Sequence, residues 1–201
     1  LVEKPLTLSI DEAQDLKKVL LDNDGKLVVG HLLLFHPAIQ KIKSIINEGK
    51  IGKIQYIYSN RLNLGTVRTE ENVFWSFAPH DISVVLALCG NRLPTSYECT
   101  GMDHLQSGIH DVTNSILKFD DIYVNINVNW LNPFKEQKMT IICEKGMVVF
   151  DDTKKENKLE LYKDYISWDS LGTTPTPIKN ECIYVEYETI SPLYNECLNF
   201  I

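Results

Sequence analysis

Several features that identify large classes of proteins are missing from this 201-residue sequence. No apolar run approaches the ~18 residues that a membrane-spanning helix needs. The cysteines are odd in number, widely scattered and without a C-x-x-C pair, which argues against a disulfide framework and a zinc site. They are Cys89, Cys99, Cys143, Cys182 and Cys197. We therefore expect a cytoplasmic protein with reduced thiols, without a metal site and without a membrane partner.

The sequence also lacks an excess of positive charge. It carries 20 Lys and Arg against 27 Asp and Glu, for a net charge of -7. A protein that binds a nucleic-acid backbone needs clustered basic residues, so nucleic acid is not an expected partner. A hydrophobic content of 44% and a charged content of 23% are typical of a soluble globular domain.

The common short motifs of nucleotide and acyl chemistry are absent as well. The sequence contains no G-x-G-x-x-G, no G-x-x-x-x-G-K-[ST] and no G-x-S-x-G. His31, His36, His104 and His110 do not have metal-ligand spacing, and we expect structural roles for them. Motifs alone therefore demonstrate no nucleotide cofactor in this chain.

Both ends of the sequence favour a fragment of a longer protein. There is no initiator Met, and the first residues have the character of the end of a strand. Residues 192–201 are typical of the first turns of a helix, and no stop signal follows them. We expect further sequence on both sides.

The first thirty residues predict one helix-strand step of a doubly wound sheet. Ser9 and Glu12 form a capping box, apolar residues recur at helical spacing behind it, and Gly25 is a candidate left-handed stop. Residues 27–30 then form a short apolar strand, the kind that is buried in a parallel sheet.

Residues 36–90 predict two more helices around a strand. His36-Pro37 begins one helix, with Pro37 suited to its first position, and Gly49 ends it. Alternating residues from Ile54 form a strand, a polar connection leads to Trp75, and Pro79 begins a third helix that Gly90 closes.

From about Thr95 the apolar period changes from 3.6 to 2, which indicates strands. Residues 122–130 alternate strictly, residues 139–150 predict a hairpin, and residues 159–162 and 184–189 predict two further strands. The expected fold is α/β (α+β), with a large, mostly antiparallel open sheet that the three helices cover on one face. The open face could pair with a second copy, which would make a homo-oligomer.

Lys4 and His80 are the candidate catalytic residues. Lys4 lies at the end of a strand, before a proline that could fix the turn through a cis bond, and could stabilise a developing negative charge on oxygen. His80 follows Pro79 at the expected helix start, where the helix dipole favours neutral imidazole, which can accept a proton from an alcohol. The alternatives are a solvated lysine and a capping or core histidine. Asp81 could complement the dipole or orient His80.

Four further residues could bind a substrate. Arg61, Asn63 and Arg68 lie along the connection to Trp75 and could bind a carboxylate or diphosphate, although a solvated loop would have the same spacing. Trp75 could stack on a sugar ring or belong to the core.

An ordered set of motifs resembles the Gfo/Idh/MocA oxidoreductase family. The set runs through Glu3-Lys4-Pro5-Leu6, Val29-Gly30 with Phe35-His36-Pro37-Ala38, 49–54, Trp75-Ser76-Phe77-Ala78-Pro79-His80-Asp81-Ile82, 130–133 and 144–152. The form that contains Gly30-His31 and Ala78-Pro79-His80-Asp81 looks like the branch associated with nucleotide-sugar and polysaccharide pathways. Because the matches follow one another over nearly the whole chain, the set is more specific than any single motif.

This resemblance implies an NAD- or NADP-dependent dehydrogenase of sugars or nucleotide-sugars. Residues 1–30 would be the end of a Rossmann domain that binds most of the cofactor, and residues 31–201 the substrate-binding and catalytic domain, truncated at its C-terminal helix. Glu3, Lys4 and Pro5 would lie beside the nicotinamide, with Lys4 as the catalytic lysine and His80 as the acid/base. The fragment alone should be inactive.

Two positions depart from the family pattern. The family often has an aspartate four residues before the catalytic histidine, where this sequence has Ser76. The family commonly has a polar Asn/Arg pair after the strand that ends in Val29-Gly30. In this sequence residues 32–34 are Leu-Leu-Leu instead. These departures leave open a second interpretation, a sugar-binding or dimerisation module without catalysis.

Overall fold

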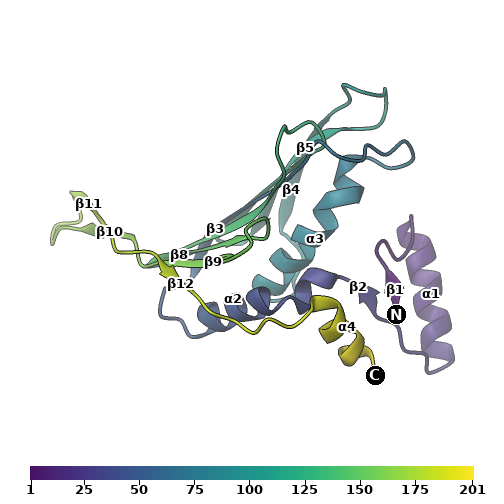
Figure 1. Ribbon diagram of the computed structural model, residues 1–201, viewed down its shortest axis with the longest axis horizontal. Helices are drawn as coiled ribbons and strands as arrows, with labels where there is room; N and C mark the ends of the chain where they lie inside the picture. Colours follow the sequence, from purple (N-terminus) through teal and green to yellow (C-terminus); the bar gives the residue numbers. More distant parts are fainter.

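The computed structural model describes residues 1–201 and contains one large sheet, two small ones and helices on one side (Figure 1). The helices are α1 (Ile10–Asp22), the 3-10 helix η1 (Leu32–Phe35), α2 (Pro37–Asn47), α3 (Val73–Leu88) and α4 (Pro192–Phe200). The strands are β1 (Val2–Glu3), β2 (Val29–Gly30), β3 (Ile54–Leu62), β4 (Ser96–Met102), β5 (Val112–Phe119), β6 (Ile122–Asn129), β7 (Glu136–Cys143), β8 (Gly146–Asp151), β9 (Leu159–Tyr162), β10 (Tyr165–Trp168), β11 (Pro175–Ile178) and β12 (Ile183–Tyr184). No helix is long and apolar enough to cross a membrane.

The first helix-strand step is confirmed. Strands β1 and β2 pair in parallel, with Glu3 opposite Gly30, and α1 connects them. The Ser9 hydroxyl accepts the amide of Glu12 at 3.2 Å, as the capping box predicts. The left-handed residue after α1 is Asp24, with φ 48°, and the assignment of that role to Gly25 is wrong. Aspartate tolerates this conformation because its short polar side chain can bond locally.

The eight-stranded sheet has the order β12-β9-β8-β7-β3-β6-β5-β4. Only β3 and β6 pair in parallel, and every other neighbouring pair is antiparallel. Along β6 the alternation places Val124, Ile126 and Val128 in the core, each at most 1% exposed. The predicted fold class is confirmed.

Helices α2 and α3 cover one face of this sheet, and the opposite face carries no helix (Figure 1). Pro37 occupies the first turn of α2, as expected, because its missing N–H would have no partner there. Helix α1 lies beside β1 and β2 and buries no residue, so the expectation that three helices cover the sheet is wrong. A crossover helix packs on the pair of strands that it connects, which here is the small sheet.

Helix α3 begins six residues before the predicted start. The Asn72 side chain caps it by accepting the amide of Trp75 at 3.0 Å. Pro79 therefore lies inside the helix, where it cannot donate to the carbonyl four residues earlier. The helix ends at Leu88 and Gly90 follows with φ 80°, as predicted.

The last third of the chain also differs from the prediction. Strand β9 has the predicted bounds, but the strand expected at 184–189 is reduced to β12, two residues long. Strands β10 and β11 form a separate hairpin that the sequence pattern did not indicate. Pro175 and Pro177 lack the N–H groups of an ordinary strand, and such residues occur only at sheet edges.

The five cysteines are free. Cys89 and Cys143 are buried in the core, and burial raises the pKa of both thiols to about 11. These two are inert apolar residues.

Candidate active site

Lys4 extends from the carboxyl end of β1 to the helix α3. Its Nζ donates to the carbonyl oxygen of Ser76 at 2.7 Å, and the Lys4–Pro5 bond is cis. Partial burial lowers the pKa of Lys4, the charges of Arg68 and Arg61 lower it further, and Glu71 opposes them. The ammonium group is therefore partly desolvated, beside the helix that carries His80.

His80 lies one turn beyond Ser76 on the same helix. Burial lowers the pKa of its imidazole to about 4, with further lowering by the charges of Arg61 and Lys4. The expected cause, the dipole at a helix start, is wrong because His80 is in the middle of α3. The consequence is unchanged, since the imidazole is neutral near pH 7 and can accept a proton.

Arg61 lies at the end of β3, not in the connection, and forms a buried ion pair with Asp81. Its Nε lies 2.6 Å from one carboxylate oxygen and its Nη2 lies 3.2 Å from the other. The hydroxyl of Ser59 donates to the same carboxylate at 2.8 Å. The interpretation of Asp81 as a first-turn acid is therefore wrong. Because its guanidinium already donates two hydrogen bonds to Asp81, Arg61 acts on the site through its charge.

Of the remaining three predicted substrate residues, Arg68 is linked to Lys4 by charge, and Asn63 and Trp75 have separate surroundings. Arg68 is exposed and its Nε lies 3.7 Å from Glu71, close enough to Lys4 to affect its pKa. Asn63 is half-buried, and its backbone N–H donates to the backbone carbonyl of Asn129. Trp75 is 44% exposed and is not a core residue.

Trp75 lies between two cavities. One, of about 460 Å³, is formed with the first residues of α1, including Ile10. The other, of about 420 Å³, is lined mainly by the outer side of α3, with Phe74 and Pro79, and by His31. An indole that lines two cavities and is 44% exposed is available to stack on a ring, whereas a packed core residue is not.

His31, for which a structural role is predicted, lies close to Lys4 and His80. Its Nδ1 is buried without a hydrogen-bond partner. Partial burial and the charge of Lys4 lower the pKa of His31, and its own charge affects His80. One signal in the sequence could have shown this. His31 directly follows β2 and Lys4 directly follows β1, and the carboxyl ends of parallel strands meet at one edge.

Glu196 on α4 approaches the base of the site from the far end of the chain. It is 1% exposed and one of its carboxyl oxygens has no partner. Burial raises the pKa of Glu196, and the charge of Glu3 raises it further. The Glu3 carboxylate itself lies against Gly30, where a Cβ atom would come within 3.2 Å of it. Nothing in the sequence pattern indicated this approach.

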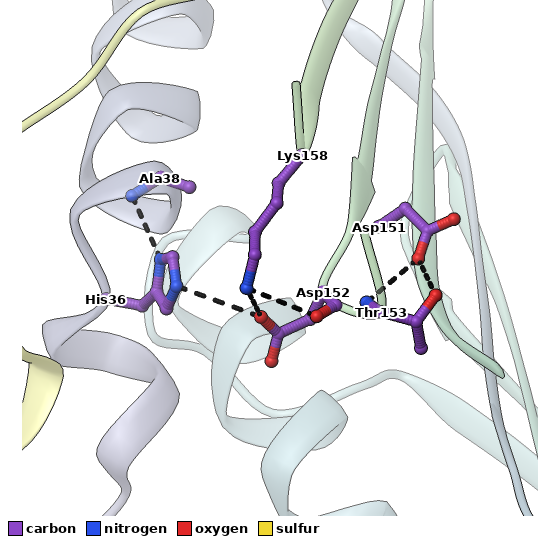
Figure 2. A network of polar contacts seen from close by, with 6 residues as sticks. All are labelled: His36, Ala38, Asp151, Asp152, Thr153 and Lys158. Atoms are coloured by element: carbon purple, nitrogen blue, oxygen red, sulfur yellow. Dashed lines mark hydrogen bonds and ion pairs between the residues drawn. The ribbon is translucent and has the colours of Figure 1, made fainter. Parts of the chain in front are cut away.

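His36 is structural, as expected (Figure 2). Its Nδ1 accepts the amide of Ala38 at 3.1 Å and so caps α2, while its Nε2 lies 3.9 Å from Asp152. Lys158 donates to the same Asp152 carboxylate at 2.7 Å. Burial lowers the pKa of His36, which keeps its capping nitrogen free of a proton. His104 pairs with the buried Asp111, and no three metal-ligating side chains lie together.

Comparison with known proteins finds similarity in sequence and in fold. The family model of the GFO/IDH/MocA C-terminal domain matches residues 39–149, more than half of the chain. Among curated proteins, an uncharacterised oxidoreductase, YrbE, of Bacillus subtilis is 29% identical over 100 residues, 47% of this chain and 29% of that protein. An NADP⁺-dependent D-xylose 1-dehydrogenase of Haloarcula marismortui is 30% identical over 60 residues, 30% of this chain and 17% of that protein.

Solved structures share the fold over almost the whole chain. A protein from Magnetospirillum magnetotacticum assigned as an oxidoreductase has a TM-score of 0.81 at 25% identity, covering 99% of this chain and 62% of its own. UDP-N-acetylglucosamine 3-dehydrogenase GnnA of Acidithiobacillus ferrooxidans has a TM-score of 0.78 at 21% identity, covering 99% and 60%. An inositol dehydrogenase homologue of Azotobacter vinelandii, complexed with NADH and myo-inositol, has a TM-score of 0.73 at 16% identity, covering 89% and 49%. This chain thus spans less than two thirds of each of these proteins.

Proposed function

The chain belongs to the GFO/IDH/MocA family, and on that basis we propose that it is the substrate-binding and catalytic part of a sugar dehydrogenase. The intact protein would transfer a hydride between a secondary alcohol of a sugar or nucleotide-sugar and NAD(P). One observation carries this proposal: the Lys4 ammonium is held 2.7 Å from the Ser76 carbonyl, one helical turn before a neutral His80. Residues 1–30 are then the end of the nucleotide-binding domain and residues 31–201 the substrate domain.

The chemistry needs a base for the hydroxyl proton and a positive charge for the oxygen. His80 takes the proton, because its imidazole is neutral at working pH. Lys4 donates to the same oxygen and stabilises the negative charge that develops there. Ser76 stands four residues before His80, where the family often has an aspartate. The backbone carbonyl of Ser76, in place of a carboxylate, orients the Lys4 ammonium.

The residues present fit one end of the cofactor. Glu3 ends β1, a strand in a parallel pair, and Lys4 and Pro5 follow it; α/β sheets bind ligands beyond the carboxyl ends of such strands. They would hold the nicotinamide, which supplies the hydride acceptor when bound. The chain has no G-x-G-x-x-G, so the pyrophosphate would be bound by the domain that precedes residue 1.

The proposed substrate class depends on four further residues, Trp75, His31, Arg68 and Asn63. Trp75, 44% exposed, would stack on a sugar ring, and His31 would line the cavity beside it. Arg68, with Asn63, would bind a diphosphate or carboxylate. GnnA, whose name gives a UDP-sugar substrate, and the xylose and inositol enzymes support this class.

We also propose that the helix-free face of the large sheet pairs with a second copy of the chain. This face carries Tyr56 and Tyr58, whose rings lie 5.8 Å apart, together with Ile116 and Tyr123, 45% and 48% exposed. An exposed apolar sheet face of this kind marks an interaction surface.

Reduction of NAD⁺ or NADP⁺ by the full-length protein, followed by nicotinamide absorbance with a panel of sugars and UDP-sugars, tests the function. Lys4→Ala and His80→Asn should each lower kcat/KM by about 10²–10⁴, the range for lost proton transfer or charge stabilisation. Lys155→Ala and His104→Asn change an exposed lysine and an exposed histidine outside the site, and should leave kcat/KM unchanged. Near-normal turnover of Lys4→Ala would contradict the assignment of Lys4 as a catalytic residue.

The pH profile of kcat/KM distinguishes His80 from an ordinary histidine. Activity should be lost only as pH falls through about 4, where His80 gains its proton. An acid limb near 6.5 would contradict this role. Sugar binding with no turnover of any substrate would favour the non-catalytic binding module instead.

A further inference from the structure

A further cavity lies between the end of α2 and the base of the hairpin that β10 and β11 form. The hairpin leaves the large sheet directly after β9 and projects from it (Figure 1). The cavity has a volume of about 520 Å³, within the range of about 300–1,000 Å³ that is typical of small-molecule sites. Its lining comes from the end of α2 and residues 50–51, the β7–β8 turn, the end of β9 and the base of the hairpin.

This cavity is separate from the candidate active site. It lies at the end of the sheet where β7 turns into β8, and Ile54 pairs with Cys143 beside that turn. Arg61, whose charge acts on Lys4, pairs with Gln137 toward the other end of the same two strands. The seven residues of β3 from Ile54 to Arg61 span about 23 Å at ~3.3 Å per residue. A ligand in the cavity would therefore not reach Lys4.

Hydrogen bonds hold both sides of the cavity in place. On one side, the backbone N–H of Lys145 donates to the carbonyl of Ile51 at 2.8 Å. Gly146 permits this close approach, because a Cβ atom there would lie 2.9 Å from Cγ2 of Ile51. On the other side, the side-chain amide of Asn180 donates to the carbonyl of Lys163 at 2.6 Å, which closes the base of the hairpin. The cavity is therefore formed before any ligand binds.

The lining of the cavity is positively charged, although the whole chain has a net charge of -7. Three of the lining residues are lysines, and Glu48 is the one acid among them. Glu48 lies 2.8 Å from the ammonium of Lys50. Lys145 and Lys163 take part in none of the ion pairs of the chain. Three positive charges and one negative charge leave a net charge of +2 around the cavity.

The rest of the lining is largely apolar. Ile45 and Ile51 belong to the hydrophobic core, and Leu161 packs against it. Tyr165, which is 41% exposed, completes this surface from the hairpin. A hydrated inorganic ion gains nothing from contact with such a surface, whereas a flat ring gains by removing it from water.

We propose that this cavity binds a phosphate monoester whose organic part is a flat ring. A phosphate monoester carries about -1.5 to -2 charges at pH 7, which matches the net charge of the lining. Its phosphate contacts the ammonium groups of Lys145 and Lys163, and its ring packs on Tyr165 and the apolar residues. Because Lys163 belongs to the base of the hairpin and Lys145 to the large sheet, the bound ligand links the two. The proposal is independent of the dehydrogenase chemistry.

Isothermal titration calorimetry of the full-length protein with phenyl phosphate tests the proposal. The double variant Lys145→Gln/Lys163→Gln should raise the dissociation constant at least about 10-fold, because two charge-assisted contacts are lost. The matched control Lys26→Gln/Lys155→Gln changes two exposed lysines outside the cavity and should leave it unchanged. Inorganic phosphate and phenol should each bind at least about 10-fold more weakly than phenyl phosphate, because each offers only half of the contacts.

A second variant and a second measurement locate the ligand. Arg68→Gln should bind phenyl phosphate normally, and bound ligand should slow amide hydrogen exchange in residues 163–180. Loss of binding in Arg68→Gln would place the ligand at the candidate active site and overturn the proposal. Unchanged binding in the double lysine variant, or no binding at millimolar concentration, would overturn it as well. Inorganic phosphate that binds as tightly as phenyl phosphate would overturn the role of the ring. None of these readouts depends on turnover, so a failed dehydrogenase assay leaves them unaffected.

Discussion

The buried pair of Arg61 and Asp81 should make a single substitution unusually costly. Asp81 is 3% exposed and Arg61 is 9% exposed, and they share two contacts at 2.6 and 3.2 Å. Asp81→Asn keeps the size of the side chain and removes its charge. The guanidinium of Arg61 would then remain buried without a counter-charge, near a second cation, Lys4.

The expected magnitude follows from what removing one partner of a buried pair does. Breaking such a pair destabilises a protein by about 3–5 kcal/mol, because a desolvated charge is left uncompensated. Asparagine retains one acceptor for Ser59, so the low end, about 3 kcal/mol, applies. For a chain of this length each kcal/mol lowers the melting temperature by about 2–4 °C. Asp81→Asn should therefore melt about 6–12 °C below the unchanged protein.

Urea unfolding followed by far-UV circular dichroism measures the loss. The control is Asp15→Asn, which breaks the Lys18–Asp15 pair on α1, where both side chains are more than 70% exposed. Exposed pairs contribute less than about 1 kcal/mol, so this control should differ little from the unchanged protein. A double variant, Arg61→Met/Asp81→Leu, removes both charges and should recover most of the lost stability.

The reasoning fails if Asp81→Asn is no more destabilised than Asp15→Asn. It also fails if the double variant is less stable than Asp81→Asn alone, because the cost would then come from packing and not from an uncompensated charge.

Three further predictions concern stability. Burial lowers the pKa of His80 to about 4 in the folded chain, so as pH falls the unfolded chain takes up this proton before the folded chain does. The free energy of unfolding should therefore be full above pH 6.5 and fall by up to about 2 kcal/mol by pH 5. In His80→Gln the free energy of unfolding, measured in urea, should change less with pH over that range. Ser9→Ala removes the α1 cap and should cost about 1 kcal/mol by thermal unfolding, while Ser9→Asp should cost much less. Ile57→Ala in the central strand should cost about 2–5 kcal/mol in urea, because Ile57 is 0% exposed, whereas Ile116→Ala on the open face should cost far less in the monomer.

Local patterns were enough to predict much of the fold. The alternation along 122–130 places the same side chains in the core that β6 buries, and the Pro37 signal marks the start of α2. Both patterns depend on the geometry of the element itself, a period of 2 or 3.6, and on which backbone groups a residue can use. The parallel step at residues 1–30 follows from the same signals.

The sequence by itself thus determined most of the element types, the buried faces of the central strands and the family to which the chain belongs. Only the tertiary structure decided how the site is assembled. The capped turn at Asn72 carries α3 through Pro79, and the fold pairs Arg61 with Asp81 and unites Lys4, His31 and His80 across 76 residues of chain. These outcomes depend on burial and on charges that are distant in sequence. A local apolar repeat of 2 or 3.6 residues cannot predict either of them.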